Sequence, residues 1–216
     1  MNMEVNRREM YRYMGYGSAE PDERTRELAE SCLEELMKAA SPRSCSRLFP
    51  LRIASDGTLD FSCFTVKSRQ LRKNLEGCGE AFLFAGTLGT GVDFLLRRYS
   101  RLSMSRAVVL QAASSALLEA YCNQENERLK KEARERGSYL RPRFSPGYGD
   151  FPLEAQKGIF RALQVEKQIG ITLTDRLLMA PSKSVTAVIG AGRTETYCEM
   201  EGCEACGKAD CPYRRG

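Results

Sequence analysis

The segment Glu80–Leu88 reads EAFLFAGTL, and the fold can be predicted outward from it. An uninterrupted apolar run of this length predicts a buried strand. Gly89 follows the run and opens a helix that is predicted over Gly91–Tyr99. The glycines of residues 86–91 do not indicate a phosphate-binding P-loop, because the Lys-Ser/Thr pair that must follow is missing. They indicate a tight turn from strand to helix, and Asp93 just beyond them is expected to have a structural role.

The segments before this strand show a helical pattern and then an extended one. Apolar residues recur at spacings of three and four over Ser18–Ala40, and Pro42 ends the predicted helix. Two strands, Arg47–Ala54 and Thr58–Val66, flank the sequence Ser55-Asp56-Gly57, which is a hairpin turn signal.

The segments after the strand are mainly helical. A long helix is predicted over Met104–Arg134, and its highly charged second half is expected to project from the core. A helix capped by Asp150 is predicted over Pro152–Ile169. The segment Arg176–Gly190 is expected to hold one or two strands split by Pro181.

Helices and antiparallel strands in mixed order predict an α+β fold. Residues 1–44 are expected to form an N-terminal arm and helix, residues 45–196 the α+β core, and residues 197–216 a small cysteine-rich tail.

The composition is that of a soluble globular protein, with 216 residues, 42% hydrophobic residues and a net charge of +5. The positive excess is too small and too dispersed for a nucleic-acid footprint, so no nucleic-acid partner is expected. We find neither a signal peptide nor an apolar run of about 18 residues, which predicts a cytoplasmic protein without a membrane partner. Histidine is absent, which excludes Ser-His and Cys-His catalytic pairs and imidazole metal ligands.

The tail concentrates four of the nine cysteines: Cys198, Cys203, Cys206 and Cys211. Their spacing, C-x4-C-x2-C-x4-C, is suited to bringing the thiolates to one metal centre. Thiolates are suitable ligands for both zinc and a [4Fe–4S] cluster, and the absence of paired C-x2-C motifs makes a standard zinc ribbon the less natural of the two. A tail without metal is the third alternative. The other cysteines lie mostly among apolar residues and are expected to be buried thiols: Cys32, Cys45, Cys63, Cys78 and Cys122.

A second candidate site is the stiff loop Arg141-Pro142-Arg143-Phe144-Ser145-Pro146-Gly147-Tyr148. The two prolines fix φ, and the glycine permits a tight turn. On such a loop, Arg143 can grip a carboxylate through two hydrogen bonds, and Tyr148 can hydrogen-bond a ligand or lie against a flat ring. The residues alone favour a proline-stiffened surface connection over a ligand site.

This loop begins a series of strings that resembles the activation domain of cobalamin-dependent methionine synthase. R-x-S-P-G-Y, V-E-K-Q-x-G and L-T-D-x-L-x-M-x-P-x-x-S-V follow one another over Arg143–Val185. The strings A-G-T-L-G-T-G-V-D and S-S-A-L-L-E-A, within residues 85–120, look like the stand-alone relatives of that domain. Together the resemblance covers roughly residues 80–190.

The resemblance implies a C-shaped α+β domain with a twisted antiparallel sheet and flanking helices, which binds S-adenosylmethionine. In that family, cobalamin oxidised to Co(II) is restored by one-electron reduction coupled to methyl transfer from S-adenosylmethionine. The family has a second acidic residue six positions before the motif arginine, and in this chain that position is occupied by Gly137. By resemblance, the ligand-binding positions are Arg143, Ser145, Pro146, Gly147, Tyr148 and, on the preceding helix, Glu119.

The resemblance therefore implies a reactivation subunit that presents S-adenosylmethionine to cobalamin on a separate methionine synthase or corrinoid protein. A flavodoxin- or ferredoxin-type protein is the expected reductant. Positioning alone suffices for this chemistry, which suits a chain without histidine. Two other functions remain possible. In these alternatives the chain is either an iron–sulfur electron-transfer or corrinoid-reducing protein, or a non-catalytic adaptor whose tail is stabilised by zinc.

Overall fold

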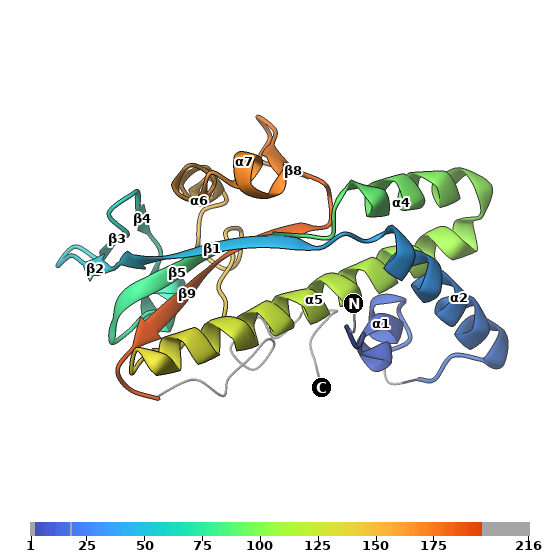
Figure 1. The fold of residues 1–216 in the computed structure, drawn as a ribbon, viewed down its shortest axis with the longest axis horizontal. Helices are drawn as coiled ribbons and strands as arrows, with labels where there is room; N and C mark the ends of the chain where they lie inside the picture. The colour runs from blue at the N-terminus through green and yellow to red at the C-terminus, as the bar shows by residue number, and fades with distance from the viewer. Residues whose placement is uncertain (1–2, 18, 196–216) are drawn as a thin grey trace.

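The computed structural model describes residues 3–17 and 19–195, and its centre is a four-stranded antiparallel sheet (Figure 1). Strand β5 (Cys78–Thr87) covers the predicted buried strand except for its last residue, Leu88. It pairs with β1 (Arg43–Pro50) on one side and with β9 (Ser184–Gly192) on the other. The short β6 (Tyr139–Leu140) pairs with the end of β9. This antiparallel sheet, flanked by helices, confirms the predicted α+β class.

Helices and short strands surround this sheet. The helices are α1 (Arg7–Tyr13), α2 (Glu23–Ala39), α3 (Arg69–Asn74), α4 (Thr90–Leu102), α5 (Met104–Glu135), α6 (Ala155–Leu163) and α7 (Val165–Ile169). The short strands are β2 (Arg52–Ile53), β3 (Thr58–Asp60), β4 (Thr65–Lys67), β7 (Thr172–Leu173) and β8 (Met179–Ala180). Within residues 3–17 and 19–195, we find no helix with both the length and the apolar character needed to cross a membrane.

Strand β5 is covered on both faces, which explains why its sequence is continuously apolar instead of alternating. Successive side chains of a strand point to opposite faces of the sheet. Leu83 packs in a cluster with residues of α6 and α7, whereas Phe82 and Phe84 pack against residues of α5. Figure 1 shows α6 and α7 on one side of the sheet and α5 on the other.

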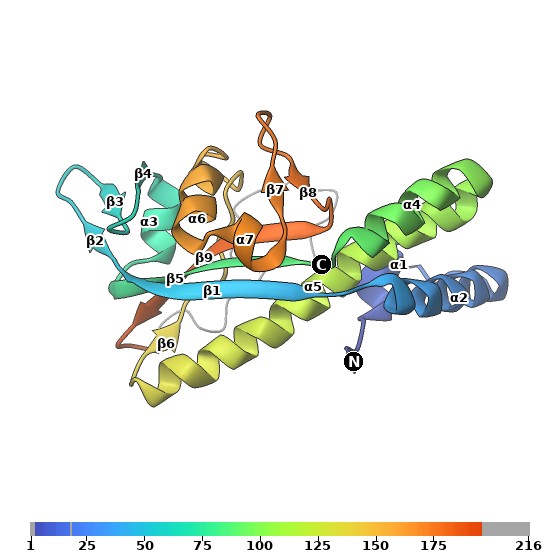
Figure 2. The ribbon, with the colours of Figure 1, turned by 45° about the horizontal axis from the view of Figure 1, so that its top comes forward.

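Helix α5 runs unbroken from the helical end of the molecule to β6, as Figure 2 shows. The prediction that its charged second half projects from the core is wrong, because Leu129 and Ala133 are buried in the cluster with Phe82. These two residues, with the buried Asn126, form a narrow stripe at spacings of three and four. The charged residues around the stripe face outward and obscure it in the sequence.

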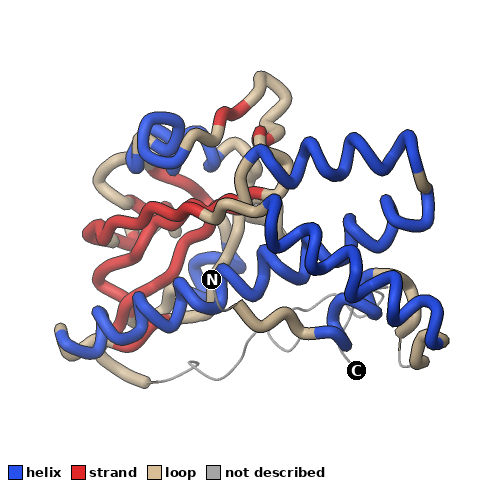
Figure 3. The backbone as a smooth tube through the Cα atoms, turned by 45° about the vertical axis from the view of Figure 1, so that its right-hand side comes forward, coloured by secondary structure: helices blue, strands red, loops and turns tan. Residues whose placement is uncertain are grey.

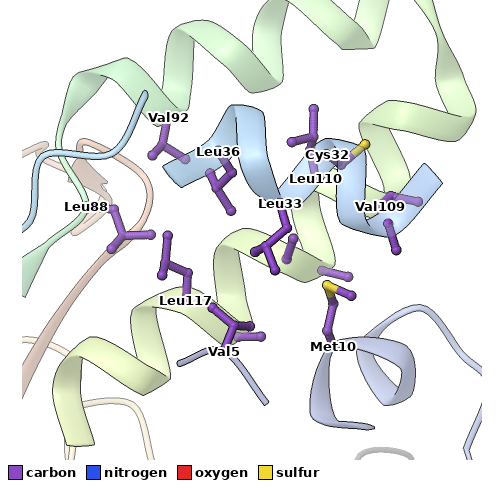
Figure 4. Packing of buried hydrophobic residues seen from close by; sticks show 14 of the residues in the cluster. Val5, Met10, Cys32, Leu33, Leu36, Leu88, Val92, Val109, Leu110 and Leu117 are labelled. Atoms are coloured by element: carbon purple, nitrogen blue, oxygen red, sulfur yellow. The ribbon is translucent and has the colours of Figure 1, made fainter. Parts of the chain in front are cut away.

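The other half of α5 joins α1, α2 and α4 in another apolar cluster. Figure 3 shows the helical part of the chain beside the sheet, and Figure 4 shows side chains of this cluster. Met10, Leu36 and Leu110 have no exposed surface there. The predicted glycine turn between strand and helix is confirmed, since Gly89 has a φ of +83° and directly precedes α4. Gly91 allows a close approach of two helices, because a Cβ at this position would clash with the carbonyl oxygen of Ala39.

The predicted hairpin is present, but its strands are divided. The turn at residues 55–57 joins β2 to β3, as predicted. The predicted strand Arg47–Ala54 is interrupted at Leu51, whose amide donates to the carbonyl of Gly79, and its first part belongs to the central sheet. The predicted strand Thr58–Val66 is broken at Ser62, which has a φ of +65°. The break at Ser62 is a turn, whereas the contact of Leu51 is with the neighbouring strand β5, and a run of extended residues reveals neither.

The predicted helix over Pro152–Ile169 is two helices, because Gln164 between α6 and α7 adopts a left-handed φ of +50°. Gly170 ends α7, as expected for a left-handed C-cap residue. Asp150 does not cap this segment. Its carboxylate instead accepts the backbone amides of Arg69 and Gln70 at the start of α3.

We expect Leu129→Ala to lower the free energy of unfolding by about 2–5 kcal/mol, because it leaves a cavity between α5 and the sheet. Gln124→Ala is the matched control, since Gln124 lies exposed on the same half of the helix and should change stability little. Urea denaturation measures both. Equal midpoints for the two variants would show that this half of α5 is not packed on the sheet.

Candidate functional site

Arg143 lies where the loop after β6 passes α5. Its guanidinium donates from Nη2 to Oε2 of Glu119 at 3.1 Å and to Oδ1 of Asn123 at 2.8 Å. Glu119 and Asn123 are four residues apart, so they share one face of α5. The structure thus brings together two of the predicted ligand residues, Arg143 and Glu119, from segments 24 residues apart.

The loop, residues 141–150, aims Arg143 at α5 because its first part continues the sheet. The amide of Arg141 donates to the carbonyl of Gly190, and Phe144 and Val188 exchange both backbone hydrogen bonds. Side chains alternate along such an extended segment. Phe144 packs with the cluster on the α6 side, so its neighbour Arg143 points to the α5 side.

The second half of the loop is a tight turn. Gly147 has a φ of +88° and donates its amide to the carbonyl of Phe151, and the amide of Tyr148 donates to the carbonyl of Ser145. Pro146 is buried within this turn. Tyr148 lies edge-on against the ring of Phe144, with 5.6 Å between the ring centroids, and 46% of the residue is exposed. Arg143 and Tyr148 are therefore directed to different neighbours, α5 and the ring of Phe144.

Asp150 ties the end of the loop to α3. Its carboxylate accepts the hydroxyl of Ser68 at 2.6 Å and the amides of Arg69 and Gln70 at 2.8 and 3.1 Å. These hydrogen bonds lower the pKa of Asp150 to about 2, and the one from Ser68 has the largest effect. The loop is thus held by β9 at one end and by α3 at the other.

A hollow of about 450 Å³ lies beside Glu119, and its lining comes from α1, α5 and the segment between β8 and β9: Tyr13, Gln111, Ala112, Ser115, Leu118, Glu119 and Lys183. Burial raises the pKa of Tyr13 to about 12, so its hydroxyl stays protonated at neutral pH. The hydroxyl donates to the carboxylate of Glu9.

Sequence reasoning missed Lys183, because it occupies a variable position in the string L-T-D-x-L-x-M-x-P-x-x-S-V. Its Nζ donates to Oγ of Ser115 at 2.9 Å and to the carbonyl oxygen of Gln111 at 3.3 Å. Burial lowers its pKa, and the nearby charge of Asp93 partly opposes this. Asp93 itself accepts the amide and hydroxyl of Ser182, which confirms the structural role expected for it.

The candidate metal ligands Cys198, Cys203, Cys206 and Cys211 lie outside the described residues. Within residues 3–17 and 19–195, no three His, Cys, Asp or Glu side chains gather as a metal site would require.

The remaining cysteines mostly follow the prediction of buried thiols. Cys32, Cys78 and Cys122 are buried, and Cys45 is half-buried. Burial raises the pKa of Cys122 to about 12 and that of Cys45 to about 11, so both stay protonated at neutral pH. Cys63 is exposed, and the prediction is wrong for this residue, because it lies in the turn that separates β3 from β4.

Comparison with known proteins relates this arrangement to one family. The family model described as vitamin B12 dependent methionine synthase, activation domain, matches residues 83–215 of the chain. Among solved structures, the chain resembles the crystal structure of the MetH reactivation domain bound to AdoHcy, with a TM-score of 0.65 and 19% identity. The match covers 92% of this chain and 75% of the other, and at this identity it shows a shared fold. The search of curated proteins gives no match.

We expect Asp150→Ala to lower the free energy of unfolding by about 1 kcal/mol at neutral pH, because α3 loses its capping carboxylate. The folded state lowers the pKa of Asp150 from 3.8 to about 2. Its contribution is therefore fully present above pH 3.8 and is lost as the pH falls toward 2. Glu154→Ala is the control, because Glu154 makes no side-chain cap at α6. Urea denaturation at several pH values measures the difference, which should shrink as the pH falls toward 2.

Proposed function

Because the chain belongs to the family of activation domains of vitamin B12-dependent methionine synthase, we propose that it binds S-adenosylmethionine. We further propose that it supports the reductive methylation of cobalamin carried by a separate methionine synthase or corrinoid protein. The observation that carries this proposal is the contact between Arg143 and Glu119 beside the hollow. The AdoHcy in the similar reactivation domain is what remains of S-adenosylmethionine after its methyl group is transferred, and it supports the same ligand class here.

The two charged groups suit the amino-acid part of this ligand. The guanidinium of Arg143 is able to grip a carboxylate through parallel hydrogen bonds, and the carboxylate of Glu119 is able to accept an ammonium group. In the structure the two side chains neutralise each other at 3.1 Å, with 20% of the Arg143 side chain and 44% of the Glu119 side chain exposed. An ion pair with this exposure contributes only about 0–1 kcal/mol. A zwitterionic ligand can therefore replace one weak ion pair by two new ones.

The loop supplies the rest of the proposed site. Ser145, Pro146 and Gly147 form a turn with internal hydrogen bonds, so a ligand binds without an added cost of ordering this segment. Tyr148 presents a partly exposed ring against Phe144, outside the lining of the hollow, and we propose that it contacts the part of the ligand that extends beyond the hollow. Cobalamin on the partner would supply the cobalt that receives the methyl group, once a flavodoxin- or ferredoxin-type protein has reduced it from Co(II) by one electron. The role of this chain is to hold the methyl donor in line with that cobalt.

We propose in addition that the tail cysteines hold a metal centre. A [4Fe–4S] cluster with four thiolate ligands would place an electron donor on the same chain as the methyl donor. A zinc ion with the same ligands would instead stabilise the tail.

We expect Arg143→Ala to weaken S-adenosylmethionine binding by about 10- to 100-fold, because hydrogen bonds between charged groups contribute about 1.5–3 kcal/mol. Arg128→Ala is the matched control, since Arg128 lies on α5 and pairs with Glu125 and Glu132 outside the hollow. Calorimetric titration of the folded variants measures both affinities. The proposal fails if the wild-type protein shows no measurable affinity, alone or with a corrinoid protein.

The metal proposal is tested by anaerobic purification, followed by an absorption spectrum and metal analysis. A broad visible band supports the iron–sulfur cluster, and stoichiometric zinc without this band supports the structural site. We expect Cys203→Ser to lose most of the metal, whereas Cys63→Ser should retain it, because Cys63 lies outside the tail. Wild-type protein that holds neither metal would contradict the proposal.

A further inference from the structure

Lys183 places a positive charge in the hollow beside Glu119. Its backbone is fixed, because its carbonyl accepts the amide of Leu88 at 2.9 Å and the hydroxyl of Thr87 at 3.3 Å. The preceding residue, Ser182, is held by Asp93. The lysine side chain therefore starts from a rigid point at the end of β5.

The ammonium of Lys183 has only neutral hydrogen-bond partners, the hydroxyl of Ser115 and the carbonyl of Gln111. Among residues 3–17 and 19–195, no carboxylate lies within ion-pair distance of it. The half-buried ammonium loses part of its hydration, which costs free energy and lowers the pKa of Lys183, and the charge of Asp93 offsets only part of this cost. An anionic group in the hollow would remove the cost.

Three polar residues form a row along α5 beside the hollow. Ser115, Glu119 and Asn123 are spaced four residues apart, so neighbours in the row are about 6 Å apart along the helix axis. Lys183 is bound at Ser115 and Arg143 at Glu119 and Asn123. Lys183 is thus bound one helical turn from Glu119, and Arg143 contacts Glu119 directly.

This row matches a group that carries a carboxylate and an ammonium close together. The ammonium group of an amino acid suits Glu119, and its carboxylate has two oxygens that two cations can share. The lysine stem is flexible, so its ammonium can exchange the neutral Ser115 for an anion inside the hollow. The volume of about 450 Å³ lies within the range of ordinary small-molecule sites.

We propose that Lys183 is a second ligand-binding cation, which shares with Arg143 the carboxylate of the amino-acid part of S-adenosylmethionine. This inference rests on the proposed function, and it identifies the amino-acid part as the portion of the ligand that enters the hollow. It also gives the N-terminal helix α1 a place in the site, since Tyr13 closes one side of the same hollow.

The test compares S-adenosylmethionine with its decarboxylated analogue, which differs only by the missing carboxylate. We expect Lys183→Met to weaken S-adenosylmethionine binding by about 10- to 100-fold and to leave the affinity for the decarboxylated analogue unchanged. Lys157→Met is the matched control, because Lys157 is exposed on α6 and does not line the hollow. Lys183→Gln serves as a second variant, and thermal melting confirms that each variant is folded.

The outcomes separate the two proposals. If the wild-type protein binds S-adenosylmethionine and Lys183→Met binds it equally well, the role of Lys183 is refuted and the proposed function stands. If both Lys183 variants lose both ligands to the same extent, Lys183 supports the structure of the site and the inference is likewise overturned. If the wild-type protein binds neither ligand, the proposed function itself fails.

Discussion

The burial of β5 on both faces is the constraint on which the rest of the structure depends. Its alternating side chains require one apolar layer from α6 and α7 and another from α5. Helix α5 supplies the second of these layers and continues unbroken beneath the sheet. The same helix also carries the packing of α1, α2 and α4 at its other end. A single 32-residue helix thus joins two of the three apolar clusters formed by the described residues.

The candidate site follows from this arrangement. The loop after β6 must cross the edge of the sheet to reach α6, and its pairing with β9 sends alternate side chains to opposite faces. Phe144 joins the apolar layer on one face, and Arg143 meets α5 on the other. The ion pair with Glu119 orients the guanidinium, but it is partly exposed and weak, so a ligand can replace it. A site of this kind is ordered before binding and still free to exchange partners.

The rigidity of the loop has several independent sources. Prolines fix φ at two positions, Gly147 permits the turn, and Asp150 fastens the far end to α3. On the other side of the site, Asp93 and the backbone of β5 hold the residues around Lys183. Binding groups on rigid supports lose little conformational freedom when a ligand arrives, so more of their interaction energy appears as affinity.

The sequence by itself determined the elements whose signals are local: the apolar run of β5, the glycine turn before α4, the hairpin turn at residues 55–57, and the motif loop that indicated the family. These features depend on neighbouring residues, whose chemistry is visible in the chain. Only the tertiary structure decided where the charged half of α5 packs, which helix Asp150 caps, and that Lys183 meets Ser115 from 68 residues away. The physical reason is that such contacts depend on which faces meet in space. The sequence around a narrow apolar stripe or a single lysine does not indicate which distant residue will contact it in the folded protein.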